Sequence, residues 1–343
     1  MKVLSKNIIL SKETNLNTEI EKSLEKIKNK LDIDKNDVIN LLSIPRESPI
    51  VEDILNRADE VCREVTGNRG KVWAAIGIDY SSCKMNCKFC SLGDKWNNNK
   101  KSYELSEEQI LSLADKFVKQ GIDWLVLRTT EFFDIEKLVK YGKILNNRYG
   151  KDKDFILTAN TGTDATIEAE KLKDAGFEMV YEAMRFREGD DTNFDVAERE
   201  KAMKNVISSG MILSQYLEPI GPEHTNEEIA DRMEEILGIG TKVSGIMPRV
   251  AVEGTPKYEL GEIDENRIAQ ITAIFRIFSK DKIEDMIIHP LTEKSLRCGA
   301  NSLVVDIGAI PRDNTMYLDA WNGQDIEKSK ETLLKNGFDV KVK

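Results

Sequence analysis

The chain has 343 residues, 40% of them hydrophobic, which is enough for the core of one large α/β barrel. Its net charge is -10 and its basic residues are not clustered. We therefore expect no nucleic-acid partner, because binding phosphates needs grouped Lys and Arg. No apolar run is long enough to cross a membrane and no signal-peptide pattern opens the chain. A cytoplasmic protein without a membrane partner is expected.

Helical patterns occupy the first part of the chain. Residues 15–32 carry apolar side chains at helical spacing, and residues 36–64 predict two more helices separated by the sequence IPRES. We assign residues 1–70 to an N-terminal helical extension.

Strand and helix patterns then alternate along the rest of the chain. The predicted strands cover residues 71–80, 122–129, 155–162, 177–186, 211–221, 243–252, 286–291 and 301–308. The predicted helices cover residues 106–121, 134–150, 164–176, 196–210, 225–240, about 264–280, 293–299 and about 324–337. This alternation predicts an α/β fold, a (β/α)8 TIM-type barrel over residues 71–323, with an open doubly wound sheet as the alternative. Residues 324–343 would form a C-terminal helix and tail.

A group of cysteines follows the first predicted strand directly. Cys83, Cys87 and Cys90 lie within the sequence YSSCKMNCKFCSLGDKW, with gaps of three and two residues. Three thiolates can bind three irons of a [4Fe–4S] cluster and leave the fourth iron open, whereas ferredoxins supply a fourth Cys. The two other cysteines, Cys62 and Cys298, are distant and lie on predicted helices, so we expect them to bind no metal.

Two other interpretations of the three cysteines are a structural zinc site and a set of buried, unreactive thiols. A structural zinc site would need a fourth Cys or His, and the chain has only two histidines. Three buried, unreactive cysteines would suit an apolar segment, but Ser, Lys and Asn surround these. An open [4Fe–4S] cluster is therefore the preferred interpretation.

The sequence CKMNCKFC resembles the signature of the radical S-adenosylmethionine (SAM) superfamily, including the aromatic Phe89 before the last Cys. The resemblance implies a [4Fe–4S] cluster whose fourth iron is chelated by the amino and carboxylate groups of SAM. It implies an enzyme that cleaves SAM to a 5′-deoxyadenosyl radical, which abstracts hydrogen from a small-molecule substrate. A reducing partner such as ferredoxin or flavodoxin would supply the electron.

Longer stretches resemble the biotin synthase-like subgroup, which includes biotin synthase, the maturase HydE and methylornithine synthase. They are RADEVCREVTGNRGKVWAAIGIDYSSC, EGTPKYEL and SLRCGANSLVVDIGAIPRD. The resemblance covers about residues 36 to 338.

The subgroup's SAM contacts can be placed on this sequence in part. The superfamily has a Gly-Gly-Glu-like turn after its second strand for the SAM amino group; here the turn reads Thr-Thr-Glu, and only Glu131 matches. Glu182 lies near the position of a residue that contacts the SAM ribose, and its alternative is an ion pair with Arg185.

Three further residues are candidates for SAM binding. Arg187 and Arg199 would suit the SAM carboxylate, which a guanidinium group binds with two hydrogen bonds, or they would be solvated helix-side arginines. Gly221, at the end of the sequence EPIGP, would let the adenosine approach the backbone closely, or would form a turn.

Polar residues near the ends of the predicted strands are the substrate candidates: Asn160, Gln215, Arg249 and His289. Arg249 suggests a carboxylate or phosphate on the substrate, because an arginine inside a barrel needs an anionic partner. The alternative partner is an internal acid such as Glu218 or Glu253. A lone His such as His289 is more often structural, and no catalytic residue is assigned.

The absence of certain cysteines limits the reactions that we expect of this enzyme. Biotin synthase draws sulfur from a second cluster, and the predicted third to fifth strands carry no cysteine for one. HmdB, a hydrogenase-cofactor relative, has five residues in its first gap, which would need Cys in place of Ser81. We expect biosynthesis of a small cofactor or amino-acid-derived molecule. Partner-dependent sulfur insertion as in lipoyl synthases, an HmdB-like role and a non-catalytic iron–sulfur scaffold stay as alternatives.

Overall fold

The computed structural model describes residues 17–97, 102–150, 152–310, 312, 316–317 and 323–341. The first helix is described over residues 17–28, and α2 (Lys35–Leu42) and α3 (Pro49–Thr66) follow it. The break predicted at IPRES is confirmed: Ser48 caps α3, whose first residue is a proline, and α3 ends at Gly67 in the left-handed conformation.

Eight parallel strands form a closed barrel, as predicted. In order around the barrel they are β1 (Lys71–Gly77), β4 (Trp124–Arg128), β5 (Ile156–Asn160), β6 (Met179–Tyr181), β7 (Ile212–Ser214), β9 (Val243–Pro248), β10 (Asp285–Ile288) and β11 (Ser302–Ala309). The barrel closes where β1 pairs with β11, from Lys71 beside Ser302 to Gly77 beside Gly308. At that last pair the backbones are so close that a Cβ on Gly77 would collide with the carbonyl oxygen of Ala309.

Some predicted strands are broken in the structure. The strand predicted over residues 211–221 is two segments, β7 and β8 (Leu217–Ile220), and within β8 the register against β9 shifts between Leu217 and Ile220. The strand predicted over residues 71–80 leaves the barrel after Gly77, and β2 (Asp79–Tyr80) pairs instead with β3 (Tyr103–Glu104). A further strand, β12 (Met316–Tyr317), lies antiparallel to β11.

Helices surround the barrel: α4 (Glu107–Lys119), α5 (Ile135–Tyr149), α6 (Thr163–Ile167), α7 (Ala169–Asp174), α8 (Val196–Ser208), α9 (Asn226–Gly238), α10 (Glu265–Ser279) and α11 (Ile326–Lys335). Single 3-10 turns are η1 (Tyr258–Leu260), η2 (Lys280–Lys282) and η3 (Ser295–Arg297). The helix predicted over residues 293–299 is thus only a turn, and Cys298 follows it instead of lying on a helix.

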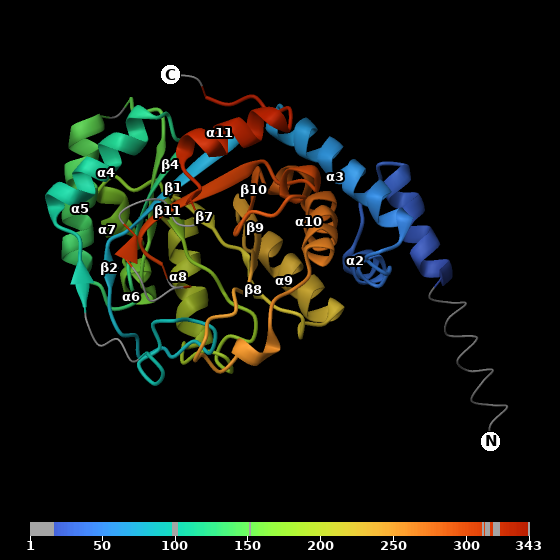
Figure 1. Cartoon of the computed structure of the whole chain (residues 1–343), viewed down its shortest axis with the longest axis horizontal. Helices are drawn as coiled ribbons and strands as arrows, with labels where there is room; N and C mark the ends of the chain where they lie inside the picture. Colours follow the sequence, from blue (N-terminus) through green and yellow to red (C-terminus); the bar gives the residue numbers. More distant parts are fainter. Residues whose placement is uncertain are drawn as a thin grey trace.

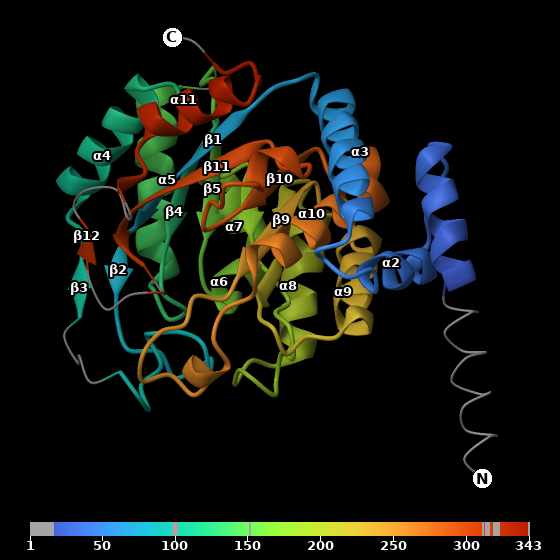
Figure 2. The ribbon, with the colours of Figure 1, turned by 45° about the vertical axis from the view of Figure 1, so that its right-hand side comes forward.

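Helices cover the side of the barrel and one of its ends, whereas loops cover the other end. The N-terminal helices α2 and α3 (blue) pack beside α9 and α10, and α11 packs across β1 and β11 (Figure 1). At the opposite end, the cysteine loop (teal) and the loop after β9 (orange) lie side by side (Figure 2). That end receives the carboxyl ends of the parallel strands, where barrel enzymes place their chemistry.

Candidate functional site

The three cysteines of the motif open on one cavity at the carboxyl end of the barrel. Cys83, Cys87 and Cys90 all line it, together with Phe89. Backbone hydrogen bonds fold the loop: Cys90 N donates to Cys87 O at 2.9 Å, and Cys83 N donates to Leu92 O at 2.7 Å. A motif that is local in sequence therefore presents three thiols to one space.

These thiols suit a metal cluster, because the positive charge of the metal favours the thiolate form. Burial raises the pKa of Cys83 to about 12 and raises the pKa of Cys87 and of Cys90. Metal binding must therefore displace the protons. Within the part of the chain that the structure describes, no three His, Cys, Asp or Glu residues are grouped so as to hold one metal ion. A four-iron cluster takes one thiolate per iron, so its ligands surround it and need not meet at one point.

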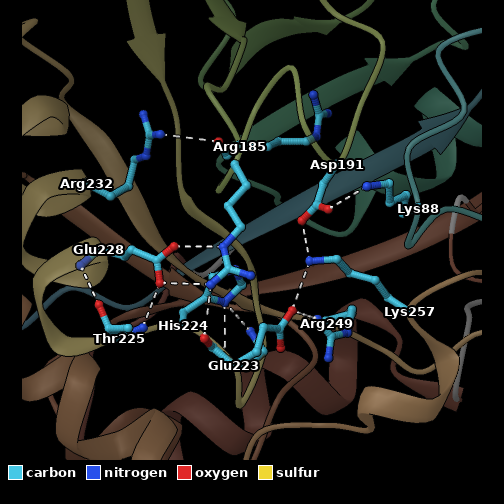
Figure 3. A network of polar contacts seen from close by, with 12 residues as sticks. Lys88, Arg185, Asp191, Glu223, His224, Thr225, Glu228, Arg232, Arg249 and Lys257 are labelled. Atoms are coloured by element: carbon cyan, nitrogen blue, oxygen red, sulfur yellow. Dashed lines mark hydrogen bonds and ion pairs between the residues drawn. The ribbon is translucent and has the colours of Figure 1, made fainter.

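Two neighbouring loops hold the cysteine loop in place (Figure 3). Lys88 N donates to Asp191 O at 2.8 Å, and Lys257 N donates to Lys88 O at 3.1 Å. The Lys257 ammonium group is paired with Asp191 and, at 3.0 Å, with Glu223. The buried cation of Lys257 thus joins the loops after β6, β8 and β9, and backbone hydrogen bonds join two of these loops to the cysteine loop.

Replacing Lys257 with Met should lower the free energy of unfolding by about 2 kcal/mol, because Asp191 and Glu223 lose the buried cation that they share and keep only Lys88 and Arg249 as partners. The Lys257 side chain is only 9% exposed. Lys88→Met is the matched control: Lys88 is 45% exposed and 3.3 Å from Asp191, so its loss should cost less than about 1 kcal/mol. Urea denaturation of the cluster-free variants measures both; equal effects would contradict the bracing role.

The Thr-Thr-Glu turn after β4 is held by side chains that a Gly-Gly-Glu turn would lack. Thr130 donates to Asp79 through its backbone N at 2.7 Å and also through its hydroxyl group. Thr129 and Thr161 share a hydroxyl–hydroxyl hydrogen bond of 2.8 Å. The departure from glycine is therefore accompanied by hydrogen bonds that fix the turn at the cavity wall.

Glu131, the residue of this turn predicted to contact SAM, lines the cavity. Its carboxylate accepts a hydrogen bond from Thr163 N at 2.7 Å. Gly162 is needed beside it, because a Cβ there would collide with the carbonyl oxygen of Glu131. Burial, and then the charge of Glu182, raise the pKa of Glu131 to about 7.

This shift predicts a pH dependence of stability. The pKa of Glu131 rises from 4.5 to about 7 on folding, so its contribution to stability is fully present below pH 4.5 and is lost as pH rises to about 7. Cluster-free Glu131→Gln should match the wild type in free energy of unfolding at low pH and exceed it by up to about 3 kcal/mol above pH 7. Thermal denaturation across pH measures the difference, and parallel curves would contradict the shift.

A buried ion pair lies beside Glu131. Glu182, just after β6, pairs with Arg199 of α8, and both side chains are 2% exposed or less. The alternative partner expected for Glu182 is wrong: Arg185 lies 3.6 Å from Glu218 instead. The Arg199 guanidinium stacks on Phe194, 3.6 Å from the ring centroid.

That ion pair is incompletely satisfied. Nε and Nη2 of Arg199 and Oε2 of Glu182 are buried and make no hydrogen bond. Both residues line the cavity. Since buried charged groups normally use their hydrogen-bonding capacity, these atoms suit a polar ligand that carries both donors and a negative charge.

Three expected contacts lie away from the cavity lining: Arg187, Gln215 and Gly221. Arg187 forms a half-exposed ion pair with Glu228 at 2.7 Å. The Gln215 amide donates to Thr241 at 2.8 Å within the core.

The other substrate candidates do line the cavity, and each has an internal partner. Asn160 donates to the carbonyl oxygen of Tyr181 at 3.2 Å. Arg249 pairs with Glu223 at 2.5 Å and donates to a carbonyl oxygen at 2.9 Å. The alternative partner predicted for Arg249 was an internal acid such as Glu218 or Glu253, and the structure shows Glu223 instead. Burial of Arg249 alone therefore does not require an anion from the substrate.

A charged cluster deeper in the cavity was not anticipated. Asp306 of β11 accepts from Arg128 at 2.7 Å and lies 2.8 Å from the imidazole of His289. These charges lower the pKa of Asp306, although burial opposes them. The one signal in the sequence is a single Asp within the otherwise apolar strand SLVVDIGA.

The remaining cysteines are apart from this cavity. Cys62 lies on α3, where burial raises its pKa to about 11, and the Cys298 thiol donates to Ser295 O at 3.2 Å. We predict that replacing both with Ala leaves about four irons per chain after reconstitution, the content of one cubane cluster. Iron and sulfide analysis measures this; loss of further iron would indicate a second cluster.

Comparison with known proteins fits this geometry. The sequence profile described as the Radical SAM superfamily matches residues 78–249, from the end of β1 to Arg249. The chain belongs to the radical SAM superfamily. It is therefore a radical SAM enzyme resembling biotin synthase, and the family implies a [4Fe–4S] cluster, SAM, a small substrate and a reductant.

Individual relatives are distant. Biotin synthase of Clostridium tetani is 25% identical over 286 residues, covering 80% of this chain and 82% of that protein. The maturase HydG of Carboxydothermus hydrogenoformans superposes with a TM-score of 0.77 at 15% identity, covering 98% of this chain and 82% of HydG. Methylornithine synthase (PylB) superposes with a TM-score of 0.72 at 16% identity, covering 93% of this chain and 97% of PylB.

Among the helices that the structure describes, none has the length and apolar character needed to cross a membrane.

Proposed function

We propose that this enzyme reductively cleaves SAM at a [4Fe–4S] cluster bound by Cys83, Cys87 and Cys90. It then acts on a small anionic molecule in cofactor or amino-acid-derived biosynthesis. The observation that carries the proposal is that the three thiols and the unsatisfied Arg199–Glu182 pair open on one cavity. When bound, the reduced cluster and SAM supply a 5′-deoxyadenosyl radical for hydrogen abstraction.

The chain's own groups have distinct parts in this proposal. Glu131 would bind the SAM ammonium group as a carboxylate, and Glu182 would accept from the ribose hydroxyl groups. Arg199, which cannot be deprotonated, would bind the SAM carboxylate through Nε and Nη2, which make no hydrogen bond, although Nε lies 3.7 Å from Glu188. Phe89 would cover the cluster side of the cavity.

The cavity lining offers an anionic substrate several guanidinium groups, although Arg249 already has Glu223, outside the lining, as its partner. Among the described lining residues, five are arginines and four are acids. The arginines are Arg128, Arg185, Arg199, Arg249 and Arg312, and the acids are Glu131, Glu182, Glu218 and Asp306.

Direct sulfur insertion is less well supported. The described cavity lining contains no cysteine beyond the three of the motif. The barrel therefore offers no further thiol for a second cluster, although the curated relatives are biotin synthases.

The test is anaerobic. The reconstituted protein should form 5′-deoxyadenosine and methionine from SAM when dithionite is added, as measured by liquid chromatography. A non-catalytic iron–sulfur scaffold would hold iron but form neither product, and that outcome would overturn the proposal.

A further inference from the structure

Tyr181 places a phenol in the same cavity as the three cysteines. It is the last residue of β6, and it lines the cavity with Glu218 of β8 and Met247 of β9. The Tyr181 hydroxyl donates to a carboxylate oxygen of Glu218 and lies 3.2 Å from the Met247 sulfur. Its ring centroid is 4.8 Å from that of Tyr216 and 6.3 Å from that of Trp73.

This environment limits what the phenol can do. Burial, followed by the negative charge of Glu218, raises the pKa of Tyr181 well above its ordinary value. The phenol therefore stays protonated at neutral pH. The phenol of Tyr181 can still lose a hydrogen atom, because a phenolic O–H bond is weaker than an alkyl C–H bond. The neighbouring rings of Tyr216 and Trp73 tolerate the unpaired electron that remains.

We propose that Tyr181 is the hydrogen-atom donor that quenches a carbon-centred radical in this cavity. The inference rests on the proposed function, which supplies the radical. In the step, the phenolic O–H bond breaks and a C–H bond forms, so the carbon radical is reduced and Tyr181 is oxidised to a neutral phenoxyl radical. The one-electron reductant that serves the cluster returns the electron, and a proton returns through Glu218.

Tyr216 is a matched control within the same aromatic group. Its ring also lines the cavity and is fully buried. Its hydroxyl, however, accepts from Ser214 at 2.8 Å and has no carboxylate hydrogen-bond partner. Replacing Tyr181 or Tyr216 with Phe removes one oxygen from the same cluster, but only the first removes the phenol paired with a proton carrier.

The experiment uses the reconstituted protein with SAM and dithionite in D2O, without a further substrate. The Tyr181 hydroxyl hydrogen exchanges with solvent, whereas carbon-bound hydrogens do not. The 5′-deoxyadenosine formed by wild type and by Tyr216→Phe should therefore carry solvent deuterium on its methyl carbon. That formed by Tyr181→Phe should lose most of this label. Mass spectrometry reads the isotope, and iron content checks that each variant holds its cluster.

A second measurement needs no variant. Freeze-quenched wild-type protein should show a phenoxyl signal in electron paramagnetic resonance that narrows when ring-deuterated tyrosine is incorporated. Equal deuterium in wild type and Tyr181→Phe, or unlabelled product from wild type without a phenoxyl signal, would overturn the role of Tyr181. Absence of 5′-deoxyadenosine altogether would instead overturn the proposed function, so the two failures are distinct.

Discussion

Replacing Cys83, Cys87 or Cys90 with Ala should remove most of the iron bound after anaerobic reconstitution and abolish formation of 5′-deoxyadenosine. Each thiolate holds one iron, so losing one leaves two irons of the cubane open and the cluster labile. All three thiols line the cavity, and no other cysteine does among the described residues, so no neighbouring thiol can substitute. Iron and sulfide analysis with the visible absorption spectrum measures the loss.

The double variant of Cys62 and Cys298 is the matched control for these replacements. It removes two buried thiols, one more than each single replacement, but none from the cavity. Its iron content should equal that of the wild type. If the triple replacement of the motif cysteines kept its iron, the assignment of the cluster to this loop would be wrong.

The strength of the sequence signal explains which parts of the fold were predictable. Each strand of the barrel is apolar and bounded by turn residues, and the repeated alternation with helices indicated the parallel barrel. The register shift of β8 against β9 depends on the pairing of two separate segments, which is a tertiary property. The segment 293–299 has helix-forming residues but closes as a single 3-10 turn, Ser295–Arg297, and nothing in the sequence pattern indicates this.

The site was predictable where it is local. The cysteine motif specifies its own loop, but the contacts among Glu131, Glu182 and Arg199 join three segments of the chain. The sequence alone does not distinguish Arg187 from Arg199 as a candidate. In the structure Arg199 lies on the face of α8 that packs against the cavity, whereas Arg187 lies in the loop between β6 and α8 and outside the cavity lining. The hydrogen bonds that Thr130 donates to Asp79 likewise join two separate segments, β2 and the turn after β4.

Arg199→Met should lower the affinity for SAM about 100-fold, because a charge-assisted, bidentate contact is worth roughly 3 kcal/mol in a buried site. The same change leaves Glu182 buried without its cation, so we also expect a loss of about 3 kcal/mol in the free energy of unfolding. Arg187→Met is the matched control. Arg187 is 36% exposed and paired with Glu228 outside the cavity lining, so SAM affinity should stay within about twofold.

The double variant Arg199→Met with Glu182→Met separates binding from folding. Removing both members of a buried ion pair restores most of the lost stability, since no uncompensated charge remains. SAM affinity should not recover, because the ligand has lost both its guanidinium partner and its carboxylate acceptor. Equilibrium dialysis with labelled SAM on the reconstituted, oxidised protein measures affinity without turnover. If the double variant bound SAM as tightly as the wild type, the pair would be structural and the SAM carboxylate would need another cation of the cavity.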